Sequence, residues 1–235
     1  MKQLFDTKTE IHEIYSSIQG EGLYIGESHL FIRFKKCNLH CVGCDEIHTA
    51  AQNLSIDEVI KTIRAIDDKK GPHRFIALTG GEPLCEGDYL ETLCSELFRY
   101  GYDVLLETNG TLFNELQKII HYCAAVSMDI KLSSVWKVPN CFNQHDKFLE
   151  NMKGCNGYIK ITISNDVLKD EFMDYINLIF RRDKSIPVFL QPFIHTSGSA
   201  DENIFCILRD LQQRALHILP TVRILAPIHK ILHIR

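Results

Sequence analysis

The chain has 235 residues, of which 45% are hydrophobic and 24% charged, and its formal net charge is −4. These values are typical of a globular protein long enough to bury a core without disulfide bonds. The basic residues are scattered rather than clustered, which argues against a nucleic-acid groove. No window approaches the uncharged apolar length of a membrane span.

The first fifteen residues, MKQLFDTKTEIHEIY, lack the apolar run of a signal peptide. The nine cysteines are an odd number. Without an export signal, we expect a cytoplasmic protein in which the thiols are free or bind metal.

Apolar strand-like runs alternate with helical patterns along the chain. Strands are predicted over 29–35, 74–79, 102–108, 124–130, 158–164, 186–192 and 221–226. Helices are predicted over 56–67, from Asp88 as the cap to Gly101, from Asn114, over 167–182 and over 202–217. Ser55 and Glu58 have the spacing of a capping box before the first of these helices.

This alternation predicts α/β architecture with mostly parallel strands. Six or so βα units favour a partial (β/α)6-type barrel, and we assign residues 1–235 to a single domain. The functional groups of such a barrel gather at the C-terminal ends of its strands. The segment 132–157 shows no clear pattern, and we predict an insertion or mobile loop there.

Three cysteines, with spacings of three and two residues, lie in the stretch 37-CNLHCVGC-44. They could hold an iron–sulfur cluster, or zinc with His40 or His48 as a further ligand, or be unrelated thiols. A [4Fe–4S] cluster bound by three cysteines leaves one iron open to a small molecule. The remaining cysteines lack ligand spacing, so we predict no second cluster; they are Cys85, Cys94, Cys123, Cys141, Cys155 and Cys206.

The C-x3-C-x2-C spacing within a βα chain resembles the radical S-adenosylmethionine (SAM) superfamily. The resemblance implies that Cys37, Cys41 and Cys44 bind a [4Fe–4S] cluster whose open iron holds the methionine part of SAM. It also implies the partial barrel of that superfamily. An aromatic residue usually precedes the third cysteine and packs near adenine, whereas this chain has Gly43.

Polar sequences follow the next predicted strands. The stretch 79-TGGEP-83 could be an ordinary strand-to-helix turn, but it resembles the motif that binds the SAM amino group. The stretches 106-LETNG-110 and 127-SMDIK-131 stand at later strand ends, where caps and turns are the alternative explanation. The SAM contacts implied by the resemblance are Gly80, Gly81, Glu82, Thr108, Asn109, Ser127, Lys131 and Gln191.

The stretch 13-EIYSSIQGEG-22, followed by FIRFKKCNLHC, resembles the 7-carboxy-7-deazaguanine synthase family over residues 13–45. That family converts 6-carboxy-5,6,7,8-tetrahydropterin to 7-carboxy-7-deazaguanine, a step towards 7-deazapurines such as queuosine. The resemblance implies that Glu21 accepts the guanidine-like edge of the pterin and that Arg33 binds its carboxylate. Gln19, Gly20 and Gly22 are expected to shape the pocket.

The C-terminal stretch 223-RILAPIHKILHIR-235 is also similar to this family. The resemblance assigns a substrate contact to His229 and places the terminal carboxylate of Arg235 near the pterin. Pro227 stands where relatives often have glutamine.

The family usually carries Asp-Thr after the third cysteine, and the threonine binds Mg²⁺. This chain has Asp45 and Glu46 instead. Because Mg²⁺ accepts carboxylate oxygens, Glu46 is the predicted ligand, with Thr49 as an alternative. Without the metal, Glu46 would repel the substrate carboxylate, so substrate preference could differ.

The chemistry implied by the resemblance begins with electron transfer from a reduced cluster to SAM. The resulting 5′-deoxyadenosyl radical takes hydrogen from C6 of the pterin, whose radical contracts its ring, loses ammonia and regains hydrogen. An electron donor such as flavodoxin or ferredoxin and a homodimer are also implied. Two alternatives stay open: another radical SAM enzyme, such as a glycyl-radical activase, and a non-enzymatic zinc or iron–sulfur module.

Overall fold

A nine-stranded sheet forms the centre of the protein in the computed structural model, which describes residues 7–44, 50–195 and 198–232. Its order is β3-β1-β2-β4-β5-β6-β7-β8-β9. Neighbours from β2 to β9 run parallel, whereas β1 is antiparallel to β2 and β3. The strands are β1 Lys8–Ile18, β2 Ser28–Phe34, β3 Gln52–Ser55, β4 Phe75–Gly80, β5 Asp103–Thr108, β6 Cys123–Ile130, β7 Gly157–Ile163, β8 Val188–Pro192 and β9 Val222–Ile224.

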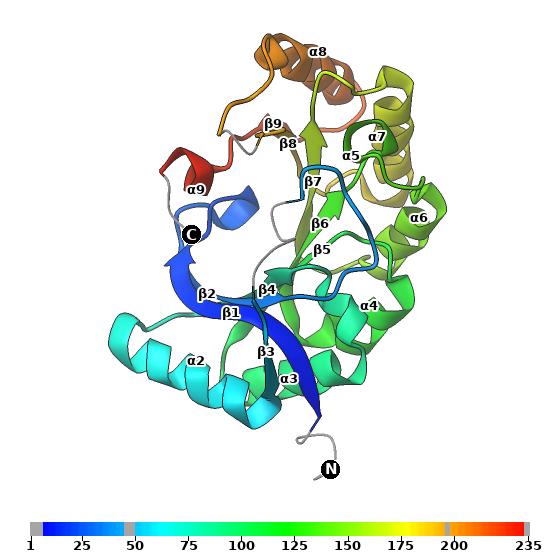
Figure 1. Ribbon diagram of the computed structural model, residues 1–235. Coiled ribbons are helices and arrows are strands. Elements are labelled where there is room, and N and C mark those ends of the chain that lie inside the picture. Colours follow the sequence, from blue (N-terminus) through cyan, green and yellow to red (C-terminus); the bar gives the residue numbers. More distant parts are fainter. Residues whose placement is uncertain (1–6, 45–49, 196–197, 233–235) are drawn as a thin grey trace.

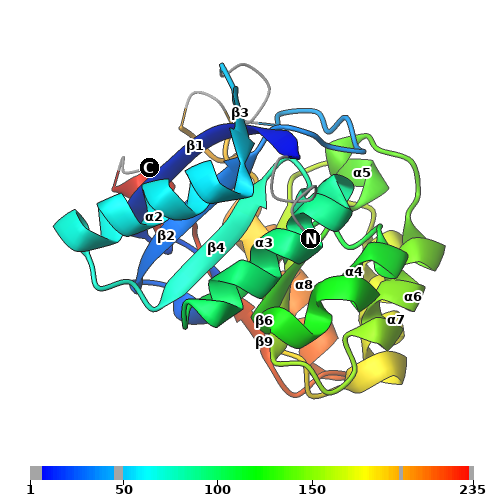
Figure 2. The same cartoon turned by 90° about the horizontal axis from the view of Figure 1, so that it is seen from below.

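The sheet curves into a partial barrel, and helices cover its outer face (Figure 1). Figure 2 shows α2, α3 and α4 side by side along that face. The helices are α2 Ile56–Lys70, α3 Asp88–Arg99, α4 Phe113–Ile119, α5 Ser133–Trp136, α6 Phe142–Asn151, α7 Lys169–Asp183, α8 Ile204–Leu216 and α9 Ile228–Ile231, with short 3-10 turns η1 Gly22–Tyr24, η2 Pro83–Glu86 and η3 Ile120–Tyr122. The predicted parallel α/β architecture is confirmed.

Apolar side chains pack on both faces of the sheet. The larger cluster lies between the sheet and the helices. A smaller cluster, which includes Phe31, Phe75, Tyr158 and Phe189, fills the inside of the barrel. Strand β7 is buried along its whole length because it is covered on both sides. The interior of the barrel therefore contains a packed apolar layer.

Local signals correctly place several helices. The capping box before α2 is present, with Ser55 N donating to Glu58 Oε2 at 2.8 Å and Glu58 N donating to Ser55 Oγ at 3.3 Å. Helix α3 begins at Asp88 itself, which makes no cap hydrogen bond, so its predicted capping role is wrong. Gly101 follows that helix with a φ of 83°, a conformation that glycine adopts without strain.

The structure differs from the sequence prediction in two regions. The strands β1 and β3 are not predicted, because they lie at the antiparallel edge and alternate weakly between buried and exposed residues. The segment 132–157, predicted to be an insertion or mobile loop, is not irregular: α5 and α6 lie there, and Phe148 and Leu149 are buried in the core. Within the described ranges, no helix has the length and apolar character needed to cross a membrane.

Candidate active site

A cavity of about 260 Å³ opens at the C-terminal ends of the strands. Its wall combines the end of β1, the cysteine loop, the ends of β4 to β8 and the start of α9. Gly22, Glu82 and Ser127 are outside this lining. The predicted residues that the fold gathers here are Gln19, Gly20, Glu21, Arg33, Cys37, Cys41, Cys44, Gly80, Gly81, Thr108, Asn109, Lys131, Gln191 and His229.

The three cysteines of the loop after β2 fit an iron–sulfur cluster. Cys37, Cys41 and Cys44 are free thiols that line the same cavity. Burial raises the pKa of Cys41 to about 11, with Lys131 opposing it, so binding of iron would have to displace a proton.

A single metal ion suits this arrangement less well. Within the part of the chain that the structure describes, no three His, Cys, Asp or Glu side chains gather around one ion-sized site. The cysteine spacing also allowed a tetrahedral zinc site, but the described residues do not form one. A cluster accepts wider spacing, because each cysteine binds a different iron atom.

The two glycines at the end of β4, Gly80 and Gly81, let the TGGEP turn pack against the chain leading into the cysteine loop. A Cβ on Gly81 would lie 2.3 Å from the carbonyl oxygen of Lys36. Gly80 has a φ of +104°, and a Cβ there would lie 2.4 Å from the carbonyl oxygen of Phe34. Gly81 N donates to Phe34 O at 2.8 Å, and Glu82 N donates to Lys36 O at 2.7 Å. Both glycines are needed for this close backbone contact.

Glu82 lies behind the cavity wall and is fully buried. Its Oε1 accepts hydrogen bonds from Thr108 Oγ1 at 2.8 Å and Leu84 N at 3.1 Å, and its Oε2 accepts one from Asn109 N at 2.7 Å. Burial raises the pKa of Glu82 to about 7 against these hydrogen bonds. The carboxylate thus ties the end of β5 to the TGGEP turn.

Asn109 connects the end of β5 to the cysteine loop. Its Nδ2 donates to Asn38 Oδ1 at 2.9 Å, and Asn38 Nδ2 donates to Thr111 Oγ1 at 2.8 Å. On the other side, the ring of His145 contacts the Asn109 carbonyl through Nε2 at 2.9 Å and Tyr175 Oη through Nδ1 at 3.0 Å. Burial lowers the pKa of His145 to about 4, so the ring is neutral and donates from Nε2 to the carbonyl.

The ends of β6 and β8 complete the cavity wall near the cysteine loop. Lys131 Nζ lies 2.9 Å from Asp129 Oδ2 and 3.9 Å from the centroid of the Trp136 ring. Gln191 is 5% exposed, and among the described residues its Nε2 has no hydrogen-bond partner. A buried amide donor at a cavity wall fits an absent polar ligand. Ser127 is buried within β6.

Phe193 occupies the space beside Gly43. Gly43 has a φ of +75°, and a Cβ there would lie 2.5 Å from Phe193 Cζ. The Phe193 and Trp136 rings meet edge to face with centroids 5.3 Å apart, and Val42 N donates to Trp136 O at 2.9 Å. An aromatic surface therefore stands next to the cysteine loop although position 43 has no side chain.

The QGEG loop, residues 19–22, joins the cavity wall to the C-terminal segment. Ile228 N donates to Gly20 O at 3.1 Å. A Cβ on Gly20 would lie 2.3 Å from His229 Nδ1, so the close packing of these two residues requires glycine. Gly22 has a φ of +66°, and a Cβ there would lie 2.0 Å from Cε2 of Tyr158. Gly22 therefore shapes the loop from outside the cavity lining.

Arg33 enters the cavity from β2 already held by two side chains. Its Nη2 donates to Tyr15 Oη at 2.7 Å, and its Nη1 lies 3.2 Å from Glu13 Oε1. The guanidinium carbon is also 5.3 Å from the centroid of the Tyr15 ring. These contacts fix the guanidinium as a fork of donors at the cavity wall.

Three charged residues of this wall were missed by the sequence analysis. Lys160 Nζ lies 2.5 Å from Glu21 Oε2 and 3.9 Å from Asp129 Oδ2, and Glu107 also lines the cavity. The signal that could have identified them is a charged residue within an otherwise apolar strand, in the middle of β7 for Lys160 and near the C-terminal ends of β5 and β6 for Glu107 and Asp129. Glu46 and Arg235 lie outside the described residues, as do Asp45, His48 and Thr49.

Comparison with known proteins identifies the family of the chain. The Radical SAM superfamily model matches residues 31–182. A 7-carboxy-7-deazaguanine synthase of Geobacter sulfurreducens is 30% identical over 241 residues, which cover 94% of this chain and 96% of the relative. The one of Aquifex aeolicus is 29% identical and covers 96% of this chain and 94% of its own length. QueE from Escherichia coli has the same fold, with a TM-score of 0.64, 21% identity and 93% of each chain covered. The chain therefore belongs to the radical SAM superfamily and, within it, to the 7-carboxy-7-deazaguanine synthase family.

Proposed function

We propose that the chain is a radical SAM lyase that converts 6-carboxy-5,6,7,8-tetrahydropterin to 7-carboxy-7-deazaguanine. The observation that carries this proposal is the cavity itself. It brings the cysteine loop, the glycines of TGGEP, the QGEG loop, Arg33 and His229 to one wall, although they are spread from one end of the chain to the other. The curated relatives from Geobacter sulfurreducens and Aquifex aeolicus carry the name of this activity.

Cys37, Cys41 and Cys44 would hold a [4Fe–4S] cluster, which supplies the electron that cleaves SAM to a carbon radical. The protein supplies binding, orientation and exclusion of water. Gly80 and Gly81 let the TGGEP turn pack against the chain leading into the cysteine loop, which brings their backbone to the cavity wall. Thr108, Asn109, Lys131 and Gln191 offer polar contacts for SAM at the wall.

Glu82 and Ser127 support this wall from behind in the proposal. Phe193 and Trp136 replace the aromatic contact that position 43 lacks, and they offer the adenine of SAM a stacking surface. On this basis Phe193→Ala weakens SAM binding in an equilibrium titration, whereas Phe205→Ala, an exposed residue of α8, does not.

The substrate side is electrostatically matched to a pterin carboxylate. Arg33 presents a fixed fork of donors, which suits a carboxylate. Glu21 presents acceptor oxygens, which suit the adjacent N–H donors of the guanidine-like edge. Gln19 and Gly20 shape the pocket between them, and His229 closes it from the C-terminal segment. His229 is a candidate proton donor late in the reaction.

Several parts of the proposal rest on the family resemblance. Glu46 is the proposed Mg²⁺ ligand, and the carboxylate of Arg235 is proposed to approach the pterin. Turnover after chelation, with and without added Mg²⁺, in the wild type and Glu46→Thr tests the first point. A flavodoxin or ferredoxin as electron donor, a homodimer and a cytoplasmic location complete the proposal.

The decisive experiment is turnover by anaerobically reconstituted protein with reductant, SAM and the carboxytetrahydropterin. We expect 7-carboxy-7-deazaguanine by mass spectrometry, loss of bound iron and activity in Cys41→Ala, and retention of both in Cys206→Ala, which alters an exposed thiol. Cleavage of SAM with an unchanged pterin would indicate another radical SAM reaction. Stoichiometric zinc and intact SAM would indicate a binding module.

A further inference from the structure

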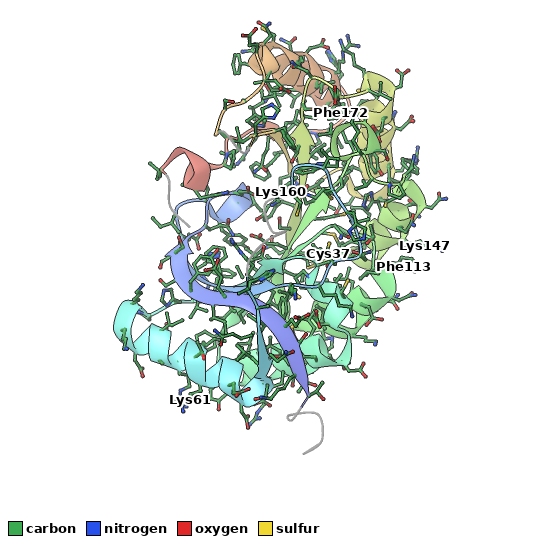
Figure 3. The ribbon with its side chains drawn as sticks, viewed as in Figure 1. Cys37, Lys61, Phe113, Lys147, Lys160 and Phe172 are labelled. Atoms are coloured by element: carbon green, nitrogen blue, oxygen red, sulfur yellow. The ribbon has the colours of Figure 1, made fainter. Side chains whose placement is uncertain are left out.

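Lys160 is a buried charge in an apolar strand. It lies on β7, whose seven residues are all buried, and it is 6% exposed. Figure 3 shows Lys160 on the concave side of the sheet, whereas Lys61 projects from the outer surface of α2 and Lys147 lies on the outer helical layer. A lysine ammonium is rarely buried without a partner, so this position requires a specific counter-charge.

That counter-charge is Glu21 of the QGEG loop, which is 139 residues away in the sequence. Lys160 Nζ donates to Glu21 Oε2 at 2.5 Å. Although burial opposes ionisation, Lys160 lowers the pKa of Glu21 below its usual value. Burial lowers the pKa of Lys160. Glu21 opposes this effect most strongly, with smaller contributions from Glu107 and Asp129, and the resulting pKa lies well above the usual range of a lysine. The pair is therefore charged at neutral pH.

The other carboxylates of the cavity have nearer partners. Glu107 Oε1 accepts from Gln19 Nε2 at 2.8 Å, and its Oε2 accepts from Thr79 Oγ1 at 2.8 Å. Asp129 pairs with Lys131 at 2.9 Å. Each of these acidic groups therefore keeps a direct partner if Lys160 is removed.

Among the described residues, Glu21 has no comparable second partner of full positive charge. His229 of α9 also favours its ionised form, and Asp129 of β6 opposes it, but both effects are smaller than that of Lys160. Lys160 occupies one position on Oε2, and a carboxylate can accept about four hydrogen bonds, so acceptor positions are left for a ligand. Burial would keep Glu21 protonated over a wider pH range without Lys160.

We propose that Lys160 is a substrate-positioning residue that holds the Glu21 carboxylate ionised at the cavity wall. This inference rests on the proposed function, because it assigns Glu21 to the edge of the substrate that carries adjacent N–H donors. A protonated carboxyl carries an O–H donor that opposes such an edge, whereas a carboxylate accepts it. Lys160 thereby selects for an amidine-like or guanidine-like ligand edge.

The test compares four reconstituted proteins: the wild type, Lys160→Met, Lys160→Arg and the double variant Lys160→Met/Glu21→Gln. Equilibrium binding of the carboxytetrahydropterin is measured between pH 5.5 and 8.5. SAM binding verifies that each variant retains the rest of the site. Lys169→Met is the matched control, since it removes an exposed lysine whose Nζ lies 2.8 Å from Asp210 Oδ2.

We expect pterin affinity to be nearly constant with pH in the wild type and in Lys169→Met. In Lys160→Met, affinity falls by about tenfold for each pH unit below the raised pKa of Glu21. Lys160→Arg restores the flat profile because it returns a positive charge. The double variant binds weakly at every pH, because no carboxylate remains to titrate. Pterin affinity in Lys160→Met that does not depend on pH overturns the proposal, whether the affinity equals that of the wild type or is uniformly weaker.

A second measurement separates this inference from the proposed function. An infrared titration follows the protonated carboxyl band of Lys160→Met, with the double variant as the reference that lacks Glu21. A band above pH 5.5 in Lys160→Met that is additional to the Glu82 band shared with the wild type and the double variant supports the role of Lys160 without any substrate. Its absence overturns that role. A wild type that binds no pterin overturns the proposed function, and the infrared band still decides the role of Lys160.

Discussion

Glu82 offers a sharp test of how the wall behind the cavity is built. The change Glu82→Gln keeps the size of the side chain and one acceptor oxygen, but it places an NH₂ group opposite the Asn109 N–H now bonded at 2.7 Å. Two donors then face each other in a site with no exposure. Loss of an acceptor for a buried N–H costs about 1–3 kcal/mol.

Ionisation of Glu82 lowers the stability of the wild type as the pH rises, and this reduces its advantage over Glu82→Gln. Its pKa is raised from 4.5 to about 7, so between these values the folded chain binds a proton that the unfolded chain has released. This proton stabilises the folded state fully below pH 4.5, and the stabilisation is lost as the pH rises through 7. Between pH 5 and pH 8 the wild type therefore loses about 2.5 kcal/mol through this group, and Glu82→Gln loses nothing through it.

Urea unfolding of both cluster-free proteins at pH 5 and pH 8 measures the difference directly. Other titrating groups contribute equally to both proteins, so they cancel in the comparison. The free-energy difference between wild type and variant is expected to shrink, or to change sign, by about 2.5 kcal/mol from pH 5 to pH 8. A difference that stays constant across this range would refute the assignment of a raised pKa and of a buried, titrating carboxyl.

Two further predictions concern the loop and the helix that support the site. Gly22→Ala brings a Cβ to 2.0 Å from Cε2 of Tyr158, whereas Gly26→Ala, at a φ of +90°, meets nothing within 4 Å. Gly22→Ala should therefore lower the free energy of unfolding by about 1–3 kcal/mol more than Gly26→Ala and should alone reduce kcat/KM for the pterin; equal effects would show that backbone strain explains both. For His145, burial lowers the pKa from 6.5 to about 4, so the stability it contributes is present above pH 6.5 and is lost as the pH falls towards 4. Urea unfolding at pH 7 and pH 4.5 should show a loss of stability that is about 2.4 kcal/mol larger in the wild type than in His145→Gln, and an equal loss in both would contradict this origin.

Much of the fold was readable from local sequence. The parallel strands from β4 to β8 are short apolar runs, and the capping box fixes the start of α2, because both signals act within a few residues. The edge strands β1 and β3 and the helix α6 were not readable. Their residues are mixed in polarity, and pairing with distant segments, rather than local preference, determines their structure.

Some features of the candidate site could likewise be predicted from local sequence, and others could not. The cysteine spacing, the TGGEP turn and the QGEG loop carry their chemistry within a few neighbouring residues, so the sequence identifies them. It could not show that the Glu82 carboxylate accepts hydrogen bonds from the Thr108 hydroxyl and the Asn109 backbone N–H. Nor could it show that Phe193 fills the room beside Gly43, because the order of strands around the barrel brings these two residues together.

The sequence by itself determined which ligand-binding groups the chain possesses: three thiols, two crowded glycines and a polar loop ahead of an arginine. Only the tertiary structure decided which charges meet. The ion pair between Lys160 and Glu21 spans 139 residues, and it forms because the barrel brings the middle of β7 beside the loop that follows β1. Local sequence cannot encode such a contact, since the energy of a buried charge depends on the partner that folding places next to it.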